Sequence, residues 1–158
     1  MIGEKIVSVN RLIDYRKNLD RANELELEIQ KIISQLDVSA IPLSDMPRSQ
    51  KPYDKLGNLT QRKIEKEDEL RKLNRTLVQQ RPILEKIINS MSELNLANIG
   101  TYQSLLKYYY IDGFDIEITC SLLNTKLADM EISESKRRLF YVWIHKAEKY
   151  FIKIQKKK

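Results

Sequence analysis

Residues 56–94 read LGNLTQRKIEKEDELRKLNRTLVQQRPILEKIINSMSEL, and leucine, isoleucine or methionine recurs along them in alternating steps of three and four. Over about five heptads this spacing places one apolar stripe along a helix, as in a coiled coil. Lys63, Lys66 and Gln80 interrupt the stripe with polar side chains. Polar residues in such a seam cost stability but fix the register of the helices.

Proline residues indicate where this helix is expected to begin and where it is expected to be interrupted. Pro82 lacks an amide donor, which predicts a kink, or a break before a shorter helix at 82–96. Upstream, Pro42, Pro47 and Pro52 alternate with turn-forming residues, so we expect a proline-rich loop over 37–53.

A second long stripe precedes the loop. Residues 4–36 contain no Gly or Pro, and their apolar positions are three or four apart, which predicts a helix roughly 50 Å long. Such a helix needs a partner, either the second stripe in an antiparallel hairpin or a helix of another chain. We therefore expect residues 1–98 to form an oligomerisation module. Its candidate contact residues are Leu12, Leu19, Leu25, Ile29, Ile32, Leu70, Leu73 and Leu77.

Composition excludes several classes of protein. The 158 residues include four Gly, all far apart, so no glycine-rich phosphate loop is present. One His and one Cys exclude a Cys/His zinc site, and we expect neither a metal nor another cofactor. The acidic cluster at 65–69 is interleaved with Lys and Arg, which is typical of a solvated helix face. No apolar run reaches the length of a membrane span, and charged residues near the N-terminus argue against a signal peptide, so we expect a cytoplasmic protein.

Positive charge is concentrated at the C-terminus. Residues 133–158 hold nine Lys or Arg and two Glu, a net +7, against +6 for the whole chain. Within 99–158, Gly100 is expected as a left-handed helix cap and Thr101 as the N-cap of a short helix. A turn at 112–113 leads to a helix capped by Asp115, and Ser133 can cap a last helix to about residue 154. Three short helices ending in a basic one predict a helix-turn-helix domain.

The last helix has two distinct faces. The run LFYVWI at 139–144 looks strand-like, but helical spacing continues through it. The predicted core stripe is Leu139, Trp143, Ala147, Tyr150 and Ile154. The basic side suits phosphates and base edges in the major groove, and its candidate DNA-binding residues are Ser135, Lys136, Arg137, Arg138, Tyr141, His145 and Lys149.

Three other features are given structural interpretations. His145 is expected to lie on the surface or contact phosphate, with no carboxylate spaced to act with it in catalysis. Cys120 is expected to be a small buried apolar side chain, and Lys156 to Lys158 a frayed tail.

Three segments together resemble phage and prophage transcriptional regulators of the ArpU/RinA type. They are LSDMPRSQKPYDKL at 43–56, YQSLLKYYYIDGFDIEITCSLLN at 102–124 and SKRRLFYVWIHKA at 135–147. The resemblance implies a regulator of late or packaging genes, whose C-terminal domain is similar to the promoter-reading region 4 of sigma factors. By position, 115–124 would be the supporting helix and Ser135 would begin the recognition helix. This chain departs from the family pattern by a longer connection, Thr125 to Ser133.

The sequence thus predicts an all-α protein with a long helical hairpin or coiled coil followed by a helix-turn-helix domain. We expect a non-enzymatic DNA-binding transcriptional regulator in the bacterial cytoplasm, associated with the nucleoid. Its expected partners are double-stranded DNA, further copies of itself as a homo-oligomer, and RNA polymerase as a further candidate, with no membrane. The rival interpretation is a coiled-coil adaptor that binds RNA polymerase or another regulator without reading DNA.

Overall fold

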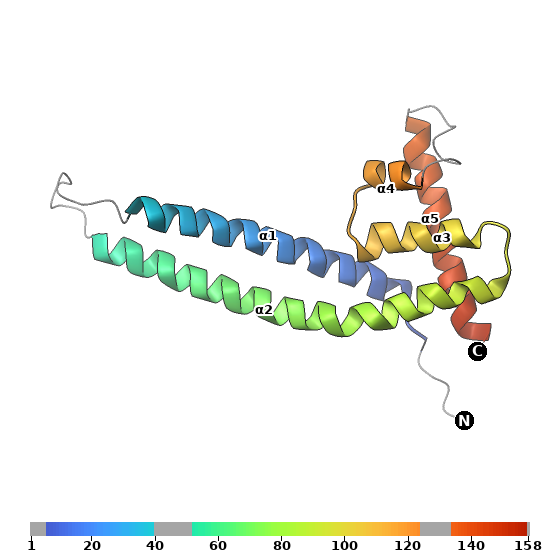
Figure 1. Cartoon of the computed structure of the whole chain (residues 1–158), viewed down its shortest axis with the longest axis horizontal. Helices are drawn as coiled ribbons and strands as arrows, with labels where there is room; N and C mark the ends of the chain where they lie inside the picture. Colours follow the sequence, from blue (N-terminus) through green and yellow to red (C-terminus); the bar gives the residue numbers. More distant parts are fainter. Residues whose placement is uncertain (1–5, 40–51, 124–133, 158) are drawn as a thin grey trace, which may run out of the picture. The chain divides into compact units, whose positions relative to one another are not determined.

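The computed structural model describes residues 6–39, 52–123 and 134–157. These residues are all-helical, and no β-strand occurs among them. The loop expected at 37–53 is shorter than predicted, because residues 37–39 are helical and so are residues 52 and 53. The rest of that loop and the connection at 125–133, with the Ser133 cap, lie outside the described residues. The elements are α1 (Val9–Ser39), α2 (Pro52–Ser90), the 3-10 turn η2 (Met91–Leu94), α3 (Ile99–Leu106), the π-helical turn η3 (Lys107–Ile111), α4 (Ile116–Leu122) and α5 (Glu134–Lys157) (Figure 1).

The chain forms two compact units. The first combines residues 1–17 with 78–158, and the second is 18–77. The first unit therefore runs across the boundary expected between residues 98 and 99 and includes the first turns of α1. The division into an oligomerisation module and a DNA-binding domain stays a prediction.

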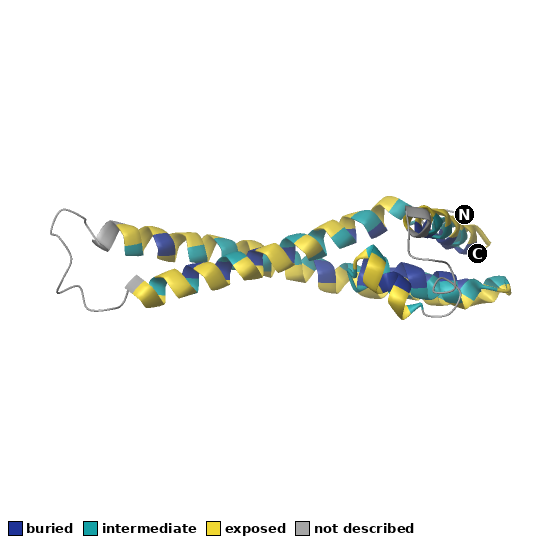
Figure 2. Cartoon of the chain, turned by 90° about the horizontal axis from the view of Figure 1, so that it is seen from above, coloured by how far each residue is buried: buried dark blue, intermediate teal, exposed yellow. Residues whose placement is uncertain are grey.

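In the unit 18–77, α1 and α2 lie side by side and run in opposite directions (Figures 1 and 2). Arg21 on α1 pairs with Glu69 on α2 at 3.1 Å, and Glu28 pairs with Lys66 at 2.6 Å. The residue numbers rise along α1 from 21 to 28 while those of their partners on α2 fall from 69 to 66, as expected for antiparallel helices. Lys66, a polar residue in the seam, thus joins the two helices by a charge pair.

The apolar stripes of α1 and α2 are buried within one chain. Of the eight candidate oligomerisation residues, Leu19, Leu70 and Leu73 are half-buried, and five are fully buried, namely Leu12, Leu25, Ile29, Ile32 and Leu77. A second chain can reach the buried side chains only if helices exchange between chains. Their role in an oligomer stays a prediction.

α2 continues through Pro82 to Ser90, so the break expected before a helix at 82–96 is wrong. Proline leaves the carbonyl of residue 78 without its helical donor. Pro82 and Val78 are both exposed, so solvent can take the place of that donor. The position of the proline on the outer side of the helix explains why the helix tolerates it.

The junction before α3 also differs from the expectation. Gly100 lies inside α3, which begins at Ile99, so Gly100 is not a helix cap and Thr101 is not an N-cap. The left-handed cap is Asn95, with φ of 52°, at the end of η2. Asparagine tolerates this conformation better than most non-glycine residues, and it places the left-handed cap five residues before the expected Gly100.

The core of the unit containing α5 is built where α3, η2 and α4 pack against that helix, and η3 reaches it through the ring of Tyr109. The Tyr102 ring lies 5.6 Å from Trp143 and 5.2 Å from Tyr150, and the Tyr109 ring lies 5.0 Å from Phe140. α2 is tied to α3 because the Gln103 side-chain amide donates to the carbonyl oxygen of residue 88 at 2.8 Å. Cys120 is buried, as predicted.

α5 buries a different stripe from the one predicted. The segment 139–144 is helical, as expected, and Ala147 and Ile154 of the predicted stripe are buried. The other buried residues of α5 are Phe140, Ile144 and Phe151. Leu139, Trp143 and Tyr150 are only half-buried. At 100° per residue the centre of the buried stripe is turned by roughly 60° from the centre of the predicted one. The run is apolar on several sides, so spacing alone permits both stripes, and the packing of α3 and η3 selects one.

Candidate functional site

The exposed side of α5 is basic. Arg138, Tyr141, His145 and Lys149 are exposed and lie within a narrow sector opposite the buried stripe. Arg137 is exposed as well, but it lies about 100° round the helix from Arg138. Ser135 and Lys136 belong to the first turns of α5, and their side chains lie outside the described residues. The structure therefore brings four of the seven candidate residues onto one exposed surface.

This surface holds little negative charge. Between Arg137 and Lys157 the sequence has one carboxylate, Glu148. None of Arg138, Lys149 and Lys153 forms an ion pair with a carboxylate in the described part of the chain. Their charges are therefore available to an anionic partner.

α4 contacts α5 and is held at its start by the predicted cap. The Asp115 carboxylate accepts a hydrogen bond from the amide of residue 118 at 2.7 Å. Gly113, with φ of 73°, provides the left-handed residue of the turn before it. The predicted turn and cap are thus confirmed, whereas the connection from α4 to α5 lies outside the described residues.

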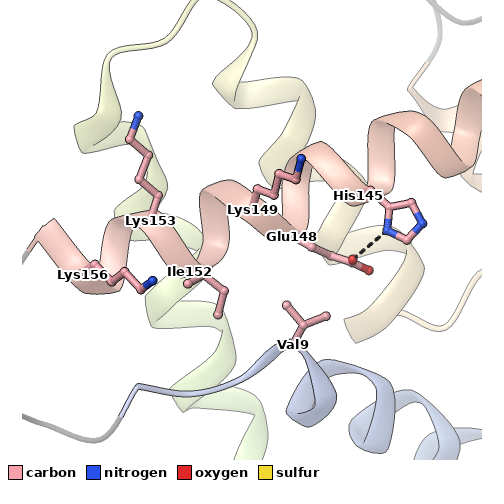
Figure 3. A pocket seen from close by; sticks show the side chains of 7 residues that line it. All are labelled: Val9, His145, Glu148, Lys149, Ile152, Lys153 and Lys156. Carbon is pink, nitrogen blue, oxygen red and sulfur yellow. Dashed lines mark hydrogen bonds and ion pairs between the residues drawn. The ribbon is translucent and has the colours of Figure 1, made fainter.

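A groove of about 790 Å³ runs along the second half of α5 (Figure 3). One side is Val9 at the start of α1, and the remaining lining residues come from α5: His145, Glu148, Lys149, Ile152, Lys153 and Lys156. Lys149 and Lys153 extend from one edge of α5, and Ile152 points toward Val9 (Figure 3). The groove thus combines an apolar floor with a basic edge.

The carboxylate of Glu148 is committed to two neighbours. It accepts a hydrogen bond from the Tyr110 hydroxyl at 2.5 Å, and its other oxygen lies 3.2 Å from Nδ1 of His145 (Figure 3 shows the second contact). The expectation that no carboxylate is spaced to act with His145 is therefore wrong, since Glu148 is one turn further on. Burial raises the pKa of Tyr110, and the bond to Glu148 raises it further, so the hydroxyl stays a donor.

The side of the groove formed by α1 depends on a contact between the two ends of the chain. The Gln155 side chain accepts from the amide of Val7 at 2.7 Å and donates to its carbonyl at 2.9 Å. These two bonds satisfy the backbone amide and carbonyl of Val7, which lies before the first residue of α1. α1 begins at Val9, several residues later than the spacing predicted.

Sequence reasoning missed Lys153 and misjudged the last lysines. α5 continues to Lys157, whose ammonium lies 3.4 Å from the carbonyl oxygen of residue 93, so the fraying expected at 156 and 157 is wrong. The signal was available in the spacing, because Lys149, Lys153 and Lys156 follow one another at four and three residues.

Comparisons with known proteins add no assignment. No family model matches the chain, and neither a curated protein nor a solved structure matches it significantly. Within the described ranges, no helix is long and apolar enough to cross a membrane.

Proposed function

We propose that this protein is a sequence-specific transcriptional regulator that binds double-stranded DNA through the exposed face of α5. The observation that carries the proposal is the division of α5 into a fully buried apolar stripe and an exposed side with Arg138, His145 and Lys149. Arginine reads the guanine edge in the major groove by paired hydrogen bonds, and lysine attracts phosphates.

α4 and α5 would act as the supporting and recognition helices of a helix-turn-helix domain. The contact of α4 with α5 supports this arrangement, and so does the Asp115 cap that fixes the start of α4. The resemblance to phage and prophage regulators of the ArpU/RinA type suggests late or packaging genes as targets. In this proposal Arg137 and Arg138 enter the major groove with the first turns of α5.

The test is selection of bound fragments from the source genome at physiological salt, followed by affinity measurements on one selected duplex. Replacing Arg137 and Arg138 with Ala should cost roughly 1–3 kcal/mol for each lost base contact and reduce the preference for the selected duplex over a shuffled one. The matched control is R62A/R75A, which removes two exposed arginines of α2 and the same charge.

Two results would count against the proposal. Absence of any enriched fragment would contradict sequence-specific binding. Equal loss of affinity in R137A/R138A and in R62A/R75A would show that only the net charge matters.

A second candidate function is an adaptor that docks on RNA polymerase or on another regulator. It is favoured by large apolar side chains that remain exposed on the helix pair, Leu27 on α1 and Ile64 on α2. Under this alternative, polar substitutions at Leu27 and Ile64 would abolish activity while Arg137 and Arg138 would be dispensable.

The proposed regulator is a homo-oligomer, which would place two α5 helices on one site with repeated half-sites. Since the stripes of α1 and α2 are already buried, an oligomer built on them requires exchange of helices. Sedimentation of the intact chain as a monomer at micromolar concentration would contradict this part of the proposal.

A further inference from the structure

The groove beside α1 has the charge pattern of a site for a linear anion. The ammonium-bearing residues Lys149, Lys153 and Lys156 follow one another at rises of roughly 6 and 4.5 Å along the helix. His145 extends the series one turn toward the N-terminus of α5. A row of cations at this spacing meets a chain of negative charges better than a single compact anion.

The carboxylate in the groove does not cancel this row. The Glu148 side chain is 15% exposed and is turned to Tyr110 and His145. The Tyr110 hydroxyl is held as a donor to it, so the negative charge is shared between two partners. The three lysines therefore set the electrostatic potential at the basic edge.

The floor of the groove is apolar and fixed in place. Val9 and Ile152 are half-buried and face each other across it (Figure 3). The two hydrogen bonds between the Gln155 side chain and the backbone of Val7 hold the start of α1 beside α5. A ligand with both anionic groups and C–H surface fits this combination, and a sugar–phosphate backbone has both.

The length of α5 decides where such a backbone lies. Lys149 to Lys156 stand roughly 17–27 Å along the axis from Arg138, which exceeds the roughly 12 Å width of the major groove. If α5 enters that groove with its N-terminal end and crosses its width, the second half lies beyond the edge of the groove, over the flanking strand.

We propose that the groove between Val9 and the second half of α5 holds the sugar–phosphate backbone of one DNA strand, with Lys149, Lys153 and Lys156 on its phosphates. This inference rests on the proposed function and deepens it. It divides α5 into a first half that reads bases and a second half that binds the backbone independently of sequence. The apolar floor receives the deoxyribose.

The test compares K153Q/K156Q with K55Q/K72Q, which removes two exposed lysines of α2 and therefore the same charge. The affinity of each intact chain is measured from 50 to 300 mM salt, on a selected duplex and on a shuffled one. Each lost phosphate contact lowers the slope of log K against log salt by about 0.9. We expect K153Q/K156Q to reduce the slope by about 1.8 on both duplexes, with the ratio of the two affinities unchanged.

Four results would overturn the inference. Equal slopes in the two double variants would leave the proposed function standing and remove the backbone site. A changed ratio between duplexes would make the lysines base readers. Unchanged DNA binding with lost binding of poly-glutamate would make the groove a docking site for an acidic protein. If the unsubstituted chain binds neither duplex, the proposed function and the inference fail together.

Discussion

The neighbours of Trp143 on α5 provide a direct test of which stripe of that helix is buried. Val142 and Ile144 lie one residue to either side of Trp143, about 100° from it in opposite directions. The stripe centred on Trp143, which the sequence predicted, makes these two residues equivalent. In the structure Ile144 is 3% exposed and Val142 is 50% exposed. Replacing each with Ala should therefore give very different results.

The magnitudes follow from burial. Ile144→Ala removes three carbon atoms from a closed core, roughly 0.8 kcal/mol each, and leaves a cavity, for a total cost of about 2–5 kcal/mol. Val142→Ala removes two half-exposed carbons, which costs little burial energy. The higher helix propensity of Ala offsets roughly 0.5 kcal/mol of that cost, so the net change in the free energy of unfolding is close to zero.

Fluorescence of the single tryptophan, Trp143, reports unfolding of the unit that contains α5. In a chain of this size the expected loss for Ile144→Ala corresponds to a fall in Tm on the order of 10 °C, against less than about 2 °C for Val142→Ala. Similar falls in both variants would refute the assignment of the buried stripe.

Three further predictions concern the cap of α4, the seam of the helix pair and the Tyr110 hydroxyl. Asp115→Ala should lower the stability of the unit containing α5 by about 1 kcal/mol, measured by urea unfolding. The hydrogen bond from Lys66 holds the pKa of Glu28 below its usual value. The contribution of this ion pair to the free energy of unfolding should therefore be lost as pH falls below about 4.5. Glu28→Gln should then show a flatter fall of Tm with acidification than the unsubstituted chain. Because the pKa of Tyr110 is raised, the contribution of its hydroxyl to the free energy of unfolding is present below about pH 10 and is lost as pH rises further. The variant Tyr110→Phe lacks this hydroxyl and should not show that loss of stability at alkaline pH.

Periodicity predicted the helices more reliably than their ends. The stripe of α1 and the seam of α2 are buried or half-buried at every predicted position, including Lys66. The start of α1 was predicted too early because the backbone of Val7 bonds to Gln155 and not within a helix. These two residues are 148 positions apart, so local spacing gives no sign of the contact. The junction before α3 was placed at Gly100 because glycine is the commonest left-handed residue, whereas Asn95 takes that role.

The candidate site was predicted in part. Arg138, Tyr141, His145 and Lys149 were assigned to the exposed side of α5, and the structure places them there. The groove could not be predicted, because Val9 and Lys153 come to line one groove only in the folded chain. The partnership of Glu148 with Tyr110 likewise depends on the packing of η3 against α5.

The sequence by itself determined that the described chain is helical, that its long helices carry continuous apolar stripes, and that its last helix is strongly basic. Helical period and composition suffice for these conclusions, because they depend on residues within a few turns of one another. Only the tertiary structure decided which stripe of α5 is buried and which lysines share a groove with Val9. Where several sides of a helix are apolar, the approach of partner elements selects the face that leaves water, and that selection is not encoded in local spacing.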